Sequence, residues 1–510
     1  MSSTKRIFKA VATVTIFAVV TRTLSFLFKI YLSRALGAEV VGLYQICLST
    51  FFLFSSLGAS GVPTVLSRKI AEDRALNSES KGYAQFSTAL ILGILVSLGT
   101  IIILFLLRPY LGALFSDTRA VPLFYIMLPA LLSTCVYSII RAWFWGSKEF
   151  TYFSVTETVE EVLRIVFTAL FVSGLFAGAS GAYGIALAFT ISDLTVAVIL
   201  IILYIVKGGK VEKPRKISEI AKPALPVTAM RVFGSLIGTI LAIMLPARLI
   251  AAGYSVADAT ASFGRIAGMA NPLLLAPNAI IASMTIVLVP EMSESGVKNN
   301  MIMLNRQVCG GINFALVISG VFMVAFAALG RELTSFLFTD IESGKYLEAA
   351  SCFMLVMPIN MITTSTLNSI GMEKQSFFSY CISAVFMLAA IYVLPKYMGI
   401  YSVVVANAAA LVICACGNMY YLRKRANLSF GFLKTTVMVA SIAVPCVFFS
   451  KWIHSLLVGP TGIFALFAAL AAGAVMYALF CYIFGLINVE SIMQFRKLKR
   501  PQPAITQTPS

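Results

Sequence analysis

One apolar stretch of this chain, residues 152–175, carries charged side chains at helical spacing. They follow one another at i, i+3, i+4 and i+7 and therefore share one face of a helix. The four residues are Glu157, Glu160, Glu161 and Arg164. Glu160 and Arg164 form a natural i,i+4 ion pair. Such a face either orients helices through a salt bridge or forms a polar wall, where the carboxylates hold arginines or bind a coupling cation.

Two other apolar stretches contain basic side chains. Arg22 and Lys29 lie on one face of the first stretch, and Arg231 lies at a similar depth in the seventh. An ionisable group at bilayer depth costs at least ~2.5–3.5 kcal/mol, so it usually faces a partner or water. We therefore expect Arg22 and Arg231 to line a cavity, whereas Lys29 either joins them or extends to the membrane surface.

Three further positions complete the candidate site. Asp193 stands alone in the sixth stretch, where it either pairs with an arginine or binds an ion. Arg265 begins the eighth stretch and is either interfacial or part of the cavity. Asn271-Pro272 and Pro277-Asn278 predict breaks in that helix, and such breaks free backbone groups that usually line a cavity.

The elements that position these residues are membrane spans. A span needs ~20 apolar residues, and about fourteen stretches meet this length with only short loops between them. Only 12% of the residues are charged, against roughly 25% in soluble chains. Spans of this kind are helices, so we predict an all-α integral membrane protein. The predicted spans are residues 7–32, 40–65, 84–107, 122–143, 152–175, 182–206, 225–250, 264–289, 309–329, 347–367, 377–394, 401–422, 432–452 and 462–487.

The loop charges predict the orientation. Lys and Arg gather on the side that holds both termini, most densely between residues 207 and 222. The positive-inside rule makes that side cytoplasmic, in a multi-pass protein of the cytoplasmic (inner) cell membrane. The net charge of +18 follows this alternation, so we expect no nucleic-acid partner.

Several chemistries are disfavoured. His454 is the only histidine, and the nine cysteines lie in or beside apolar spans. We therefore expect no metal site, no bound cofactor and no structural disulfide. Outer loops are short, and the sequence lacks nucleotide-binding and Gly-x-Ser-x-Gly motifs, so an enzyme is not expected.

Two segments indicate an internal duplication. Residues 108–117 and 331–340 share an arginine, a Leu-Phe pair and a closing Ser/Thr-Asp at the same offsets. Parallel repeats of this kind are a known transporter plan. We predict an N-lobe at 1–210, a C-lobe at 211–427, two additional spans at 428–488 and a cytoplasmic tail at 489–510.

Four segments also resemble one known family, in matching order. Residues 32–44 are similar to the first loop of the stage V sporulation protein B family, as are Glu160-x-x-x-Arg164, residues 264–290 and residues 367–371. This family belongs to the polysaccharide-exporter branch of the MOP superfamily, beside MurJ and Wzx flippases and, distantly, MATE drug exporters.

The resemblance implies two six-helix lobes in a V shape, with alternating access. It also implies an undecaprenyl-pyrophosphate-linked saccharide as cargo, with lipid II foremost, whose pyrophosphate meets cavity arginines. Arg22 matches a first-helix arginine of MurJ-like proteins, and Asn271 lies near their eighth-span arginine. The predicted cargo-binding residues are Arg22, Lys29, Arg164, Arg231, Arg265 and Asn271. The predicted ion-coupling or charge-positioning residues are Glu157, Glu160, Glu161 and Asp193. We expect a monomer among membrane lipids, coupled to Na⁺, H⁺ or the membrane potential.

Other functions fit the same spans. A cation-coupled multidrug exporter would use Glu157, Glu160, Glu161 and Asp193 to bind drug cations, although the basic residues would hinder it. A flippase for another polysaccharide repeat unit needs the same arginines. A membrane polymerase or glycosyltransferase needs catalytic acids and usually a large outer loop.

Overall fold

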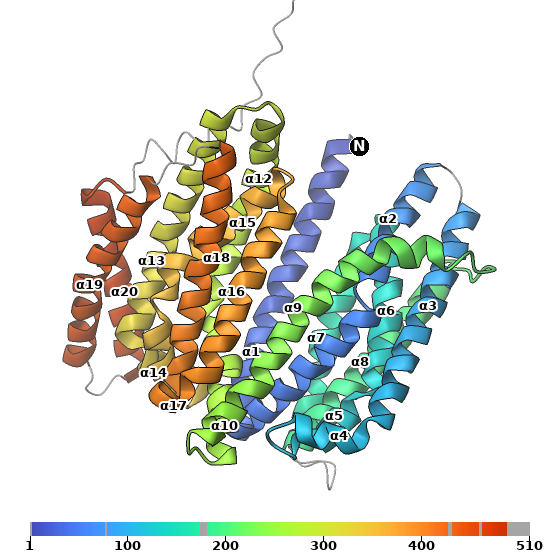
Figure 1. Cartoon of the computed structure of the whole chain (residues 1–510), viewed down its shortest axis with the longest axis horizontal. Coiled ribbons are helices and arrows are strands. Elements are labelled where there is room, and N and C mark those ends of the chain that lie inside the picture. The colour runs from blue at the N-terminus through green and yellow to red at the C-terminus, as the bar shows by residue number, and fades with distance from the viewer. Residues whose placement is uncertain (1–2, 77–78, 174–180, 427–430, 458–461, 487–510) are drawn as a thin grey trace, which may run out of the picture. The chain divides into compact units, whose positions relative to one another are not determined.

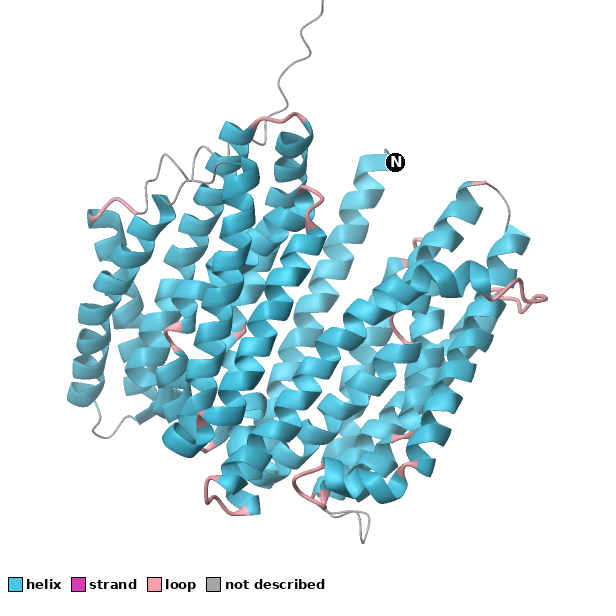
Figure 2. Cartoon of the chain, viewed as in Figure 1, coloured by secondary structure: helices cyan, strands magenta, loops and turns pink. Residues whose placement is uncertain are grey.

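The computed structural model describes residues 3–76, 79–173, 181–426, 431–457 and 462–486. Helices joined by loops make up this part of the chain, which contains no strand (Figure 2). The predicted all-α membrane fold is confirmed. The α-helices are α1 (Ser3–Gly58), α2 (Gly61–Ala75), α3 (Glu79–Leu106), α4 (Arg108–Leu114), α5 (Ala120–Met127), α6 (Pro129–Gly146), α7 (Phe150–Val172), α8 (Ala182–Val206), α9 (Ser218–Ala251), α10 (Val256–Gly264), α11 (Asn271–Leu274), α12 (Ala276–Val297), α13 (Met301–Phe338), α14 (Ile341–Ala350), α15 (Phe353–Ser369), α16 (Glu373–Val393), α17 (Pro395–Met398), α18 (Ser402–Ala426), α19 (Gly431–Leu457) and α20 (Gly462–Ile483). A π-helix, η1 (Arg265–Ala270), and a 3₁₀-helix, η2 (Gly399–Tyr401), complete the list.

The spans agree with the helices. Ten helices of the described part are long and apolar enough to cross a membrane, or twelve if each bent helix pair is one span. One of the ten covers two predicted spans, because α1 continues through a kink at Gly37, where φ is 76° and favours glycine. The helix α7 is not among the ten, because its four charged side chains make it less apolar than the others. Residues 174–175, residue 487 and the tail predicted at 489–510 lie outside the described residues.

The predicted break in the eighth span is present. The π-helix η1 ends at Ala270, α11 begins at Asn271, and the axis bends by 42° before α12. π-Helical turns are rare in proteins overall, and those that do occur often lie at functional sites. The sequence therefore predicted the position of the helix break but not the π-helical turn.

The chain packs as two compact units. Unit 1 comprises Met1–Pro272, Leu337–Asp340 and Leu388–Ser402, and unit 2 comprises Leu273–Phe336, Ile341–Met387 and Val403–Ser510. This division does not coincide with the lobe boundary predicted after residue 210, because α9 packs along α1 and α2 (Figure 1). The repeat relation between two six-helix lobes stays a prediction.

Each unit has its own apolar core. In unit 1, Leu66, Phe86 and Leu200 bring α2, α3 and α8 together. In unit 2, Ile312 and Phe432 belong to a second cluster that joins α13 to α19. The unit 1 core fixes α6 and α8, two of the three helices that carry the candidate site.

Candidate functional site

Five charged side chains meet inside unit 1, and we call them the buried charge cluster. Arg164 is the centre. Its guanidinium lies 2.7 Å from a Glu160 oxygen, 3.2 Å from Glu161 Oε2 and 3.3 Å from Asp193 Oδ1. Arg141 donates to the other Glu160 oxygen at 2.7 Å. The cluster thus consists of Arg141, Glu160, Glu161, Arg164 and Asp193.

Three packed helices hold the cluster. The helix α7 supplies its three members at i, i+1 and i+4 and packs along both α8 and α1, while α6 packs on α8 (Figure 1). Asp193 is only 1% exposed, and the Thr134 hydroxyl of α6 donates to its second oxygen at 2.8 Å. Every carboxylate of the cluster therefore has at least one donor, as burial requires.

Aromatic rings cover the two guanidiniums. Arg141 lies 4.7 Å from the Tyr137 ring centroid, and Arg164 lies 5.1 Å from that of Phe189. A cation over a ring face gains ~0.5–2 kcal/mol, more when desolvated. These rings limit the directions in which either arginine can move.

The helix α1 packs along α7 and carries the half-buried Lys29. Thr21 and Thr158 share a hydrogen bond of 2.8 Å, which also joins α1 to α7.

Three of the four predicted acids are paired with an arginine. The Glu160–Arg164 pair is confirmed, and Asp193 pairs with an arginine. Glu157 is half-buried and has no polar partner among the described residues, so the cluster does not include all of the predicted face. Arg141 was missed because it lies close to the end of the span predicted at 122–143, where a basic residue is ordinary.

The other predicted arginines lie apart from the cluster. Arg22 in α1 and Arg231 in α9 are both exposed, and neither has an ion-pair partner in the described part of the chain. Both belong to unit 1. Asn271 is half-buried at the first turn of α11. The structure therefore leaves two cations available in the apolar helices, while the acids of the cluster are already paired.

A second group of charges surrounds the kink of α1. Arg119 lies 2.7 Å from both Glu39 and Asp117, and Arg265 lies 2.9 Å from Asp340. Asp117 and Asp340 are the last residues of the two similar segments, 108–117 and 331–340. Each forms its ion pair with an arginine that lies outside its own segment. Burial alone would raise the pKa of the Asp117 carboxyl, but the hydrogen bonds from Arg119 outweigh burial and hold that pKa below its ordinary range.

Glycines let α1 and α10 approach closely near these ion pairs. A Cβ at Gly42 would lie 2.1 Å from the Thr260 carbonyl oxygen, and one at Gly264 would lie 2.1 Å from that of Ala38. Neither contact is possible for a larger residue. Arg265, which follows Gly264, is thereby placed at a tight helix–helix seam.

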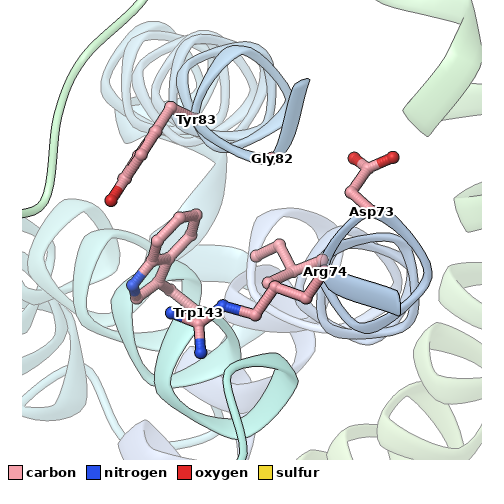
Figure 3. Close-up of a pocket in the computed structure, with 6 residues that line it drawn as sticks. Asp73, Arg74, Gly82, Tyr83 and Trp143 are labelled. Carbon is pink, nitrogen blue, oxygen red and sulfur yellow. The ribbon is translucent and has the colours of Figure 1, made fainter. Parts of the chain in front are cut away.

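A small cavity lies elsewhere in unit 1. It is lined by Ile70, Asp73, Arg74, Gly82, Tyr83 and Trp143. Figure 3 shows the Arg74 side chain extending toward Trp143, while the Asp73 carboxylate points away from that ring. None of the predicted site residues lines this cavity. In the described part of the chain, no group of His, Cys, Asp and Glu could hold a metal ion.

The chain is similar to known proteins over most of its length. A family model described as polysaccharide biosynthesis protein matches residues 7–295, more than half of the chain. Stage V sporulation protein B of Bacillus subtilis (strain 168) is 23% identical over 493 residues, which cover 93% of this chain and 94% of that protein. Sporulation protein YkvU of the same organism is 22% identical over 399 residues, covering 76% and 88%.

Solved structures share the fold. The lipid II flippase MurJ, in an inward closed conformation, matches with a TM-score of 0.72 at 16% identity, covering 96% of this chain and 99% of that one. An inward-facing multidrug resistance MATE family transporter of the MOP superfamily matches with a TM-score of 0.69 at 18% identity, covering 81% and 98%. The chain is therefore a multi-pass membrane protein with the fold of the MOP superfamily, and it belongs to the polysaccharide biosynthesis protein family.

Proposed function

We propose that this protein is a flippase that moves an undecaprenyl-pyrophosphate-linked saccharide, with lipid II as the first candidate, across the cytoplasmic membrane. In this proposal both termini are cytoplasmic, access to the cargo alternates between the two sides, and the protein acts as a monomer. The similarity to stage V sporulation protein B and the MurJ-like fold support this cargo class.

One observation carries the proposal. Arg22 and Arg231 are exposed within apolar helices and have no ion-pair partner among the described residues. By contrast, Glu160, Glu161 and Asp193 are paired with arginines. Available cations and neutralised acids suit an anionic headgroup, and a guanidinium binds a phosphate group through two parallel hydrogen bonds.

The buried charge cluster has a different role in this proposal. Its members donate to and accept from one another, so a cargo headgroup would have to break ion pairs before it could bind there. We assign the cluster to positioning α6, α7 and α8. H⁺, Na⁺ and the membrane potential are the candidate energy sources for movement.

A second candidate function is a cation-coupled multidrug exporter. The observation that favours it is Glu157, a half-buried carboxylate that has no partner in the described part of unit 1. A drug cation would need such an acid. The exposed Arg22 and Arg231 would repel it, so this function ranks second.

Reconstitution separates the two functions. The purified protein is placed in liposomes with fluorescent lipid II in the inner leaflet, and label in the outer leaflet is measured with an impermeant quencher. The flippase proposal expects label to appear faster than in protein-free liposomes. Proton- or sodium-driven uptake of a cationic dye, without movement of any lipid-linked saccharide, would contradict it.

A further inference from the structure

The segment between α8 and α9 is basic; within it Lys207 lies 4.4 Å from the Tyr152 ring centroid and Arg215 lies 3.9 Å from Glu219. Residues 207–217, here called the basic strap, contain five cations and one acid, Glu212. All five cationic side chains are exposed. They are Lys207, Lys210, Lys213, Arg215 and Lys216. The buried charge cluster and the exposed Arg22 and Arg231 do not involve this segment.

Side chains of α3 and α8 fix the path of the basic strap. The Tyr204 hydroxyl donates to the Lys210 carbonyl at 2.8 Å, and the backbone N–H groups of Glu212 and Arg215 donate to Ser87 and Thr88 of α3 at 3.0 and 2.7 Å. Figure 1 shows this segment, in green, beside α3. A segment pinned at three backbone positions presents its lysines in a set arrangement.

Apolar side chains are exposed between the cations. Val211 is 73% exposed, and Val206, the last residue of α8, is 74% exposed. Exposed apolar residues beside lysines are typical of segments that lie in the headgroup region, with the apolar side chains toward the acyl chains. The strap directly follows α8, which is long and apolar enough to cross a membrane, so we place the strap beside the headgroups.

We infer that the basic strap is a binding surface for the anionic phospholipids of the surrounding bilayer. Clusters of four to eight Lys and Arg next to a span attract anionic headgroups, with about 1 kcal/mol for each basic residue near the surface. The five exposed cations match that density, and the pinned backbone lowers the ordering cost of collecting several headgroups. The inference does not depend on the cargo of the proposed flippase.

Binding of defined lipids to the purified full-length protein tests this inference. Native mass spectrometry measures how much phosphatidylglycerol and phosphatidylcholine each variant retains during a lipid titration. The test variant carries Lys207→Gln, Lys210→Gln, Lys213→Gln and Lys216→Gln. The charge-matched control places the same change at four exposed lysines elsewhere: Lys298, Lys374, Lys396 and Lys434.

The test variant should bind phosphatidylglycerol roughly several hundredfold more weakly, since four cations at about 1 kcal/mol each contribute about 4 kcal/mol and each 1.4 kcal/mol is tenfold. Its phosphatidylcholine binding should not change, and the control should keep wild-type phosphatidylglycerol binding. Unchanged phosphatidylglycerol binding in the test variant would overturn the inference. So would a loss of lipid-linked saccharide binding with phosphatidylglycerol retained, because the strap would then serve the cargo.

A second variant tests the pinned path while keeping every charge. Ser87→Ala with Thr88→Val removes two acceptors of the strap backbone, so phosphatidylglycerol binding should weaken although net charge is unchanged. Wild-type binding in this variant would show that charge density alone is sufficient and would refute the pinned arrangement. Neither readout uses transport, so either result is independent of the flippase assay.

Discussion

Replacing Arg164 should destabilise the protein more than any other single change in the buried charge cluster. Arg164→Met keeps a long, unbranched side chain at this position and removes the cation that contacts Glu160, Glu161 and Asp193. Removing one partner of a buried ion pair costs about 3–5 kcal/mol, because the remaining charge is stranded. Glu160 keeps Arg141 at 2.7 Å, but Asp193 keeps only the Thr134 hydroxyl. The free energy of unfolding should therefore fall by about 3–5 kcal/mol.

The second substitution to combine with Arg164→Met is Asp193→Asn. Alone it should cost about 1 kcal/mol, since the amide still accepts from Thr134 and Arg164 keeps two carboxylates. Added to Arg164→Met, it should restore part of the loss, because a neutral amide replaces a stranded acid at a site that is 1% exposed. Adding Glu160→Gln instead should restore less, because it strands Arg141.

Unfolding of the purified protein in mixed micelles, followed by circular dichroism, measures these differences. Lys298→Met is the matched control, because it removes an i,i+4 pair with Glu294 that is more than 60% exposed on both sides and should change stability by less than about 0.5 kcal/mol. An Arg164→Met protein as stable as wild type would show that the three carboxylates do not need this cation. So would an Asp193→Asn protein as unstable as Arg164→Met.

Three further outcomes follow from the geometry. Arg22→Lys should recover only part of the flipping that Arg22→Ala loses, because an ammonium lacks the two-pronged guanidinium contact; equal rates for Lys and Arg would contradict this. Gly264→Ala should lower the thermal midpoint, since its Cβ would meet a carbonyl oxygen at 2.1 Å, whereas Gly310→Ala, with no neighbour within 4 Å, should not. The pKa of Asp117 is lowered in the folded protein, so this carboxylate stabilises the fold fully above the ordinary carboxyl pKa. That stabilisation is lost as the pH falls through the pKa of Asp117 in the folded protein. An Asp117→Asn protein should therefore lose less stability on acidification than wild type.

Much of the fold follows from the sequence because the bilayer permits so few alternatives. Long apolar runs must be helices there, and the predicted spans are helical in the described part of the chain, although some, such as 122–143 and 347–367, are each divided between two helices. The sequence also indicated the Glu160–Arg164 pair, because i,i+4 spacing is a local property of one helix. The break near Asn271 could be predicted for the same reason, because a proline interrupts the hydrogen bonds of the helix that contains it.

Tertiary contacts were less accessible to sequence reasoning. Arg141 lies on a different helix from Glu160, and nothing in its own span distinguishes it from an interfacial arginine. The packing of α9 along α1 and α2, within unit 1, was likewise not indicated by the sequence, because it depends on contacts between segments far apart in the chain. Glu157 shares the periodicity of its neighbours, yet the packing of α7 leaves it outside the cluster.

The proposed function requires the available cations Arg22 and Arg231 to bind the anionic headgroup of the cargo. The most direct test compares wild type with Arg22→Ala and Arg231→Ala proteins in the liposome assay with fluorescent lipid II, after confirming equal insertion and unfolding midpoints. Each variant should lose most or all flipping, since an arginine–phosphate pair contributes about 1.5–3 kcal/mol. Wild-type flipping rates in both variants would contradict it.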